Sequence, residues 1–113
     1  MAGFTLPEET PESQLGPSTA SILRTRDIPW DIYMTARLIS DKDLQLLRRY
    51  DNKNPGTQAR LLAENGAACF ATFLTVLKNV TKDETVQYAL ALLDDALSAD
   101  PRRAALVWAA AAL

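Results

Sequence analysis

The sequence contains no histidine and only one cysteine among its 113 residues. The lack of histidine removes the commonest general base, the commonest metal ligand and the usual partner of a catalytic serine or cysteine. A single cysteine, Cys69, cannot form an intramolecular disulfide, which favours a reducing compartment such as the cytosol. Since no histidine is available to activate it, we predict that Cys69 is a core thiol rather than a nucleophile.

Strong net charge is also missing. The formal net charge is −2, which argues against nucleic acid as a partner because nucleic-acid binders usually carry a concentrated basic surface. The nucleotide-binding loop, the dinucleotide fingerprint, the HExxH helix, paired CxxC motifs and the EF-hand loop are all absent from the sequence. We therefore expect no cofactor, no bound metal and no catalytic site.

Composition divides the chain into two parts. Residues 1–17 contain three of the six prolines and little to bury, so we predict a disordered Pro/Glu-rich tail. Residues 18–113 show helical periodicity with short capped turns and no convincing strand pattern, so the predicted class is all-α. The predicted helices lie within 18–27, 29–38, 41–50, 57–78, 81–97 and 102–113.

Local signals set several helix ends. Ser18 or Thr19 is suited to cap the first helix, and Ser40 the third. The run Thr81-Lys82-Asp83-Glu84 has the spacing of a capping box between Thr81 and Glu84. Asp100 followed by proline is suited to start the last helix.

Apolar spacing predicts which sides of the long helices are buried. In 57–78 the stripe passes close to Gly66, where the missing side chain would let another helix approach. In the helix after Thr81, Tyr88 and Leu92 form a second apolar shoulder. Its principal predicted stripe is Val86, Ala89, Leu90, Leu93, Ala96 and Leu97.

The adjacent acids Asp94 and Asp95 are the most obvious candidate for a catalytic pair. On a helix, neighbouring side chains leave the axis ~100° apart and cannot converge on one reacting atom. We therefore predict that both are solvated and that neither is catalytic.

Four residues are candidates for a partner interface: Trp30, Tyr33, Arg48 and Arg49. Trp30 and Tyr33, like Tyr88, could anchor an interface through a large ring with a polar tip, or could pack in the core. Arg48 and Arg49 could dock a partner or could simply be solvated.

Successive amphipathic helices of this length indicate the start of a helical-repeat stack rather than a closed bundle. The final AALVWAAAAL is apolar on nearly all sides, which predicts that further protein covers it. We expect residues 18–113 to be the leading, truncated part of a longer solenoid.

Two segments, IPWDIYMTARLISDKDLQLLRRYD and CFATFLTVLKNVTKDETVQYALALLDDAL, resemble the N-terminal region of the H subunit of the vacuolar-type proton ATPase (V-ATPase). The resemblance spans about residues 28–97, in the same order and with similar gaps. It implies a HEAT- or armadillo-like superhelix and a non-catalytic accessory subunit of a rotary pump.

The resemblance also implies partners and a location. In that family the N-terminal domain holds the peripheral stalk, which is formed by the E and G subunits of the V1 sector, and the C-terminal domain governs whether ATP hydrolysis is coupled to proton transport. The expected location is the cytosolic face of vacuolar or other acidic-organelle membranes, with membrane contact only through the complex. An armadillo-type peptide-binding adaptor unrelated to the pump is the alternative.

Overall fold

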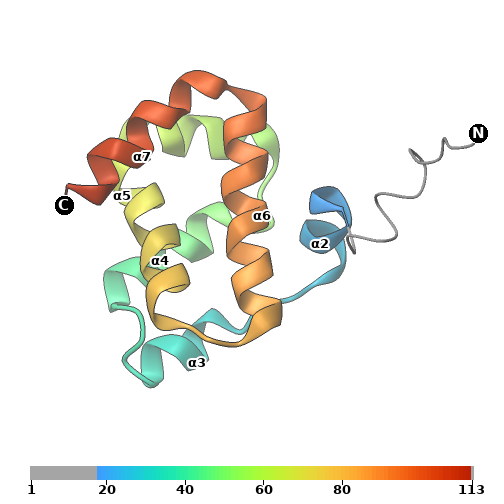
Figure 1. Cartoon of the computed structure of the whole chain (residues 1–113), viewed down its shortest axis with the longest axis vertical. Coiled ribbons are helices and arrows are strands. Elements are labelled where there is room, and N and C mark those ends of the chain that lie inside the picture. The colour runs from blue at the N-terminus through green and yellow to red at the C-terminus, as the bar shows by residue number, and fades with distance from the viewer. Residues whose placement is uncertain (1–17, 113) are drawn as a thin grey trace, which may run out of the picture.

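The computed structural model describes residues 18–112, and helices account for nearly all of its regular structure (Figure 1). No strand occurs between residues 18 and 112, which confirms the all-α class. The tail predicted for residues 1–17 lies outside the described residues. The elements are α2 (Thr19–Thr25), α3 (Trp30–Thr35), α4 (Asp41–Tyr50), α5 (Pro55–Asn79), α6 (Asp83–Ala99), the 3-10 turn η2 (Pro101–Arg103) and α7 (Ala104–Ala111).

Side-chain caps start three of the helices where the sequence places them. Ser18 accepts a 3.2 Å hydrogen bond from the Ser21 amide at the start of α2. Ser40 and Asp43 form a reciprocal capping box at the start of α4, with both bonds 3.0 Å long. Asp100 accepts from the Arg102 amide at the start of η2. Each cap satisfies an amide that has no partner inside its helix.

Two helix starts differ from the prediction. Asn54 caps α5 by accepting a 2.8 Å bond from the Thr57 amide, so that helix begins two residues early, at Pro55. The capping box predicted between Thr81 and Glu84 does not form. Lys82 is the N-cap of α6 and makes no side-chain cap bond, so Thr81 lies one residue outside the position that a capping side chain needs.

Helix α3 ends at Thr35, three residues before its predicted end. Arg37 takes a left-handed conformation with φ 65°. Its amide bonds to the Met34 carbonyl and the Leu38 amide bonds to the Tyr33 carbonyl, each at 2.9 Å. These two bonds form a Schellman motif, which satisfies the last carbonyls of the helix and turns the chain.

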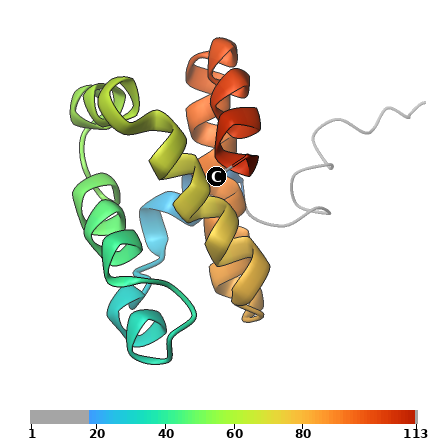
Figure 2. The same ribbon diagram turned by 90° about the vertical axis from the view of Figure 1, so that its left-hand side faces the viewer.

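Helix α5 is the central element. It packs against α4, α6 and α7, while α2 packs against α6 and α3 against α4. In Figure 2, α4 and the first half of α5 lie on one side, α6 and α7 lie on the other, and the second half of α5 runs between them. By length and composition α5 could cross a membrane, as can the core helix of a soluble protein; here its apolar side chains line the shared core.

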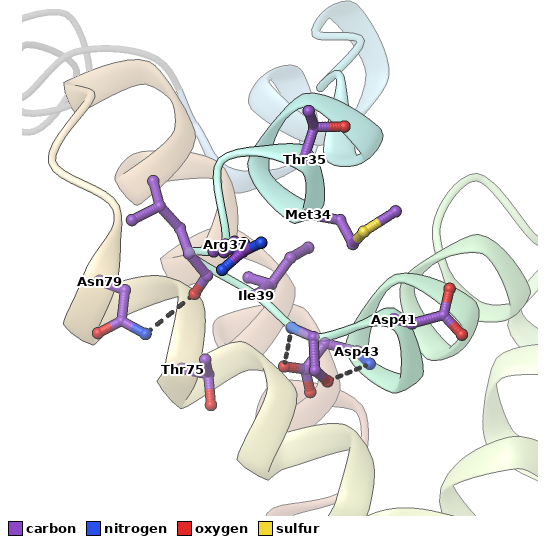
Figure 3. Close-up of a pocket in the computed structure, with 10 residues that line it drawn as sticks. Met34, Thr35, Arg37, Ile39, Asp41, Asp43, Thr75 and Asn79 are labelled. Carbon is purple, nitrogen blue, oxygen red and sulfur yellow. Dashed lines mark hydrogen bonds between the residues drawn. The ribbon is translucent and has the colours of Figure 1, made fainter.

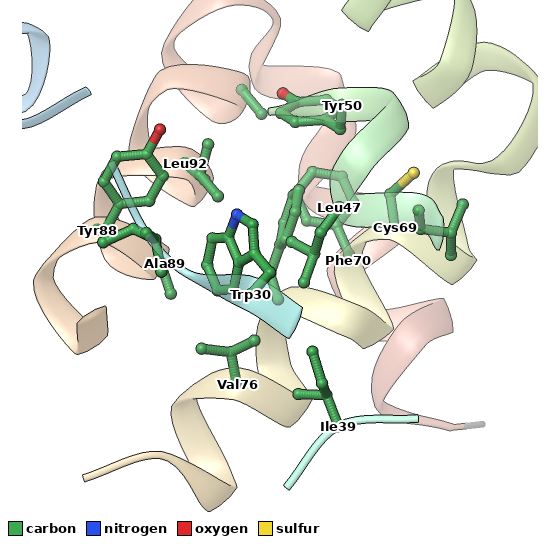
Figure 4. Close-up of a cluster of buried hydrophobic side chains, with 14 of the residues drawn as sticks. Trp30, Ile39, Leu47, Tyr50, Cys69, Phe70, Val76, Tyr88, Ala89 and Leu92 are labelled. Carbon is green, nitrogen blue, oxygen red and sulfur yellow. The ribbon is translucent and has the colours of Figure 1, made fainter. Parts of the chain in front are cut away.

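Aromatic rings fill the centre of that core (Figure 4). Phe73 meets Tyr50 of α4 edge-on at 5.3 Å and Phe70 at 5.7 Å, between ring centroids, which is a favourable geometry for aromatic pairs. Cys69 is buried beside them, which confirms the prediction of a core thiol.

The helix α5 is broken at Asn65, whose backbone has φ −137° and ψ 38°. At the next residue, Gly66, an added Cβ atom would lie only 2.6 Å from Cδ1 of Leu106 on α7. The close approach expected at Gly66 is therefore confirmed, and the helix that makes it is α7.

The buried face of α6 is rotated in part from the one predicted: Ala89 and Ala96 of the predicted stripe are buried, and Leu93 and Leu97 pack partly against the core. Leu90, placed in the principal stripe, is 51% exposed, whereas Tyr88 and Leu92, placed on a side shoulder, are buried. The apolar pattern allowed either face. Both α2 and α5 pack against α6, and Ala20 and Leu23 of α2 line one hollow together with Tyr88 and Leu92. Asp94 and Asp95 are both exposed, as predicted.

Candidate partner-docking site

A shallow groove of about 300 Å³ lies between the start of α3 and the end of α4. Two of the four predicted interface residues, Trp30 and Arg48, line it together. We call it the α3–α4 groove; its lining is Asp27, Ile28, Trp30, Asp31, Leu47, Arg48, Asp51, Asn52 and Lys53.

The floor of the α3–α4 groove is built around a buried carboxylate. Asp51, only 8% exposed, follows the last residue of α4. Its Oδ2 accepts a 2.9 Å hydrogen bond from Trp30 Nε1, and its Oδ1 accepts from the hydroxyl of Tyr88 on α6. Both carboxylate oxygens are thus held by neutral donors, which offsets the cost of burying the group.

Aromatic packing adds rigidity to this floor. The Trp30 ring meets Tyr88 edge-on, with centroids 6.0 Å apart. Burial, and then the bond to Asp51, raises the pKa of Tyr88 well above its ordinary value, so its proton stays in place to donate. Tyr33 shares a 2.7 Å hydrogen bond with Thr85 of α6. The three helices α3, α4 and α6 are therefore tied together beneath the groove.

The rim of the α3–α4 groove carries charge of both signs. Asp27 and Asp31 come from the α3 side, while Arg48 and Lys53 come from the end of α4, and all four line the groove. Asn52, between them, takes a left-handed backbone with φ 61°, which asparagine tolerates well. A rim of this kind suits a partner whose own surface carries both signs.

The structure separates the four predicted interface residues. Trp30 is only 6% exposed, and Tyr88 is buried, so core packing describes both rings. Tyr33 is half-buried against α6. Arg48 and Arg49 are exposed, but Arg49 does not line the groove and lies close enough to Cys69 for its charge to oppose the rise in that thiol's pKa.

Three groove residues, Asp51, Asn52 and Lys53, are not identified by sequence reasoning. The signal available is the turn-forming run DNKNPG, which by itself predicts only the end of a helix. Nothing in that run shows that Asp51 meets Tyr88, which is 37 residues away in the chain.

A second, larger hollow of about 650 Å³ lies at the connection between α3 and α4 (Figure 3). Three of its polar side chains hold the backbone. Asn79 donates to the Leu38 carbonyl at 2.9 Å, Thr75 donates to the Ala71 carbonyl at 2.9 Å, and Asp43 accepts from the Ser40 amide. None of the four predicted interface residues lines this hollow, so the α3–α4 groove is the candidate site.

Cys69 and the metal-ligating side chains were the other candidates for chemistry among the described residues. Burial raises the pKa of the Cys69 thiol to about 11, which keeps it protonated and unreactive near neutral pH. Between residues 18 and 112 no group of three or more metal-ligating side chains is placed to hold an ion.

The fold and this groove define a class of protein: an all-α, helical-repeat-like domain with a charge-rimmed groove between α3 and α4. Residues 17–112 match the family of the H subunit of the V-ATPase. The chain belongs to that family.

Three relatives come from different organisms. The chain is 47% identical over 91 residues to the probable H subunit of the V-type proton ATPase of Oryza sativa subsp. japonica, covering 80% of this chain and 20% of that protein. It is 37% identical over 84 residues to the H subunit of the V-type proton ATPase of Drosophila melanogaster, covering 74% and 17%. A probable second form of that H subunit in Caenorhabditis elegans is 32% identical over 96 residues, covering 82% and 20%. The chain thus spans about a fifth of the length of these relatives.

Proposed function

We propose that this chain is a non-catalytic structural and regulatory element of the V-type proton ATPase that docks on the peripheral stalk formed by the E and G subunits. Family membership over residues 17–112 is the observation that carries this proposal. The chain would act on the cytosolic face of vacuolar or other acidic-organelle membranes and would meet the membrane only through the complex. By holding the stalk, it would support the coupling of ATP hydrolysis to proton transport.

The α3–α4 groove is the surface we assign to this docking. Its floor is fixed by Trp30 and Asp51, so binding would require little ordering of the groove itself. Arg48 and Lys53 at the rim would pair with acidic side chains of a stalk helix. Arg49 and the half-buried Tyr33 would extend the contact beyond the groove.

Ile32 supports this placement. It is 59% exposed on α3, between Asp31 of the groove and Tyr33. An exposed branched aliphatic side chain beside a charged rim gives a partner helix an apolar contact as well as ion pairs. The charged pairs would set orientation and on-rate, and the apolar contact would slow dissociation.

The experiment is a pull-down of the purified stalk heterodimer by the full chain. The double variant Arg48→Glu, Lys53→Glu should lose binding, because it places acid against acid. The double variant Arg60→Glu, Lys78→Glu is the matched control, since both residues are exposed on α5 outside the groove. Circular dichroism should show the same helix content in all three proteins.

Two outcomes would overturn the proposal at different levels. If the folded parent chain fails to bind the stalk heterodimer, docking on the stalk is wrong. If the parent binds and the double variant binds equally well, the stalk is the partner but the α3–α4 groove is not the surface. Recovery from lysate of unrelated cargo in place of pump subunits would favour the adaptor alternative.

A further inference from the structure

The break in α5 falls on an asparagine that is followed by glycine, Asn65-Gly66. It is the only one of the four asparagines in the sequence with glycine after it. Asparagine side chains can be attacked by the main-chain nitrogen of the next residue, and that nitrogen is least shielded when the residue has no Cβ atom. Asn65 is therefore more open to this attack than the other three asparagines.

The backbone at Asn65 departs from helical geometry. The ψ angle of Asn65 sets the direction of the next N–H, that of Gly66. In a helix ψ is about −42° and the N–H points along the axis at a carbonyl one turn back. At Asn65 ψ is 38°, about 80° from the helical value, so the peptide between the two residues is turned out of the helical direction. The Asn65 side chain is exposed, which gives water access to it, while Gly66 is buried and its missing Cβ faces Leu106.

We propose that Asn65-Gly66 is a site of spontaneous deamidation in the folded protein. The Gly66 nitrogen gives its proton to hydroxide and forms a bond to Cγ of Asn65. The side-chain nitrogen then takes a proton from water, which regenerates the hydroxide, and leaves as ammonia. The product is a five-membered succinimide. Water then opens this ring at either carbonyl, which leaves aspartate or isoaspartate at position 65.

The other asparagines are held in ways that oppose the reaction. Asn54 precedes Pro55, which has no N–H to lose, and it caps α5 through a 2.8 Å bond. Asn79 precedes the β-branched Val80, and its amide donates to the Leu38 carbonyl at 2.9 Å. Asn52 precedes lysine, whose side chain shields the nitrogen.

The product would act on the contact between α5 and α7. Position 66 has no space to spare, since a Cβ there would lie 2.6 Å from Leu106. Isoaspartate adds a methylene to the main chain one residue before this contact, and either product adds a negative charge. Deamidation would therefore push α7 off α5 and uncover the apolar surface between them.

The test is peptide mapping by mass spectrometry of the folded full chain, aged in mildly alkaline buffer below its melting temperature. Asn65 should lose its amide at least about tenfold faster than Asn52 or Asn79, because it alone of these three precedes a residue without a side chain. Loss should quicken as pH rises, since the attacking nitrogen must be deprotonated. Hydrogen exchange in α7 should increase in step with the modification.

Two comparisons make the result decisive. Asn65→Gln, whose longer side chain must close a larger ring, should stay unmodified and keep α7 protected over the same period. A synthetic peptide of residues 59–72 gives the rate without the fold. If that peptide is modified while Asn65 in the folded chain keeps its amide as long as Asn79 does, the proposal is wrong.

Discussion

Trp30 Nε1 and Asp51 Oδ2 are joined by a buried 2.9 Å hydrogen bond that links the first turn of α3 to the end of α4. The same carboxylate accepts the hydroxyl proton of Tyr88 from α6. Asp51 therefore ties three helices together beneath the α3–α4 groove. The hydrogen bonds from Trp30 and Tyr88 together offset the cost of burying its carboxylate.

Removing one donor should destabilise the fold measurably. Tyr88→Phe keeps the ring and its packing but leaves Oδ1 of Asp51 without its partner. Hydrogen bonds to charged groups contribute ~1.5–3 kcal/mol, and we expect a loss of that size in the free energy of unfolding from urea denaturation. Asp95→Asn, an exposed acid on the same helix, is the control and should change it by less than ~0.5 kcal/mol.

The contact between Gly66 and Leu106 predicts that Gly66→Ala changes stability in opposite directions with and without the Leu106 side chain. Gly66→Ala should gain ~1 kcal/mol in helix propensity but lose more by crowding Leu106, for a net destabilisation of ~1–2 kcal/mol. In a Leu106→Ala background the crowding is gone, so the same change should be neutral or stabilising. A double-mutant cycle measured by urea unfolding should give a coupling above ~0.5 kcal/mol. Additive effects would show that α7 does not rest on Gly66.

The features that sequence predicted well are those fixed by neighbouring residues. The caps at Ser18, Ser40 and Asp100 depend on side chains that reach amides two or three positions away, and that spacing can be found by inspection. The close approach of another helix at Gly66 could also be predicted, because a glycine in an apolar stripe leaves room for a neighbouring helix.

The features that sequence missed depend on distant parts of the chain. The buried face of α6 was decided by α2 and α5, since both of its apolar sides satisfied the same periodicity. The floor of the groove needs Asp51 and Tyr88 to meet across 37 residues. The break at Asn65 has no local signal beyond the glycine that follows it, and α7 presses against that point.

Two variants, each with aspartate at one position of α6, test which face of that helix is buried. Leu92→Asp places an acid in the core and should unfold the chain, because an unpaired buried charge costs several kcal/mol. Leu90→Asp, at a position that is half-exposed, should leave helix content unchanged. Circular dichroism distinguishes them. The reverse result would restore the stripe predicted from periodicity, with Leu90 inside.

Stability should fall in alkali and not near neutral pH. Burial raises the pKa of Cys69 from 9.0 to about 11 and that of Tyr50 from 10.0 to about 12. Above pH 9 the unfolded chain loses these protons while the folded chain keeps them, so unfolding becomes easier as pH rises. Each group can cost up to about 1.4 kcal/mol per pH unit between its two pKa values.

The measurement for this alkaline loss is urea denaturation at a series of pH values. Tyr50→Phe should reduce the loss that begins above pH 10 and leave the parts due to Tyr88 and Cys69. With no histidine in the chain, little change is expected between about pH 6 and pH 8. A steep transition in that neutral range would mean that a buried acid titrates there.

The fluorescence of the two tryptophans should differ, because one ring is buried and the other is exposed. Trp30 is 6% exposed and hydrogen-bonded in the core, whereas Trp108 on α7 is 80% exposed. Trp108→Phe should leave a blue-shifted emission that acrylamide quenches poorly. Trp30→Phe should leave a red-shifted emission that acrylamide quenches readily, and it should also lower stability because Asp51 loses a donor.

Dilution extends the fluorescence test to the exposed side of α7. Trp108 is exposed on a helix of small apolar residues. A second chain that packed on α7 would bury this indole. In the Trp30→Phe protein, emission from Trp108 should be independent of concentration if α7 faces water in the monomer. A blue shift that grows with concentration would mean that two chains bury α7 against each other, and Trp108→Glu should then abolish both the shift and the association.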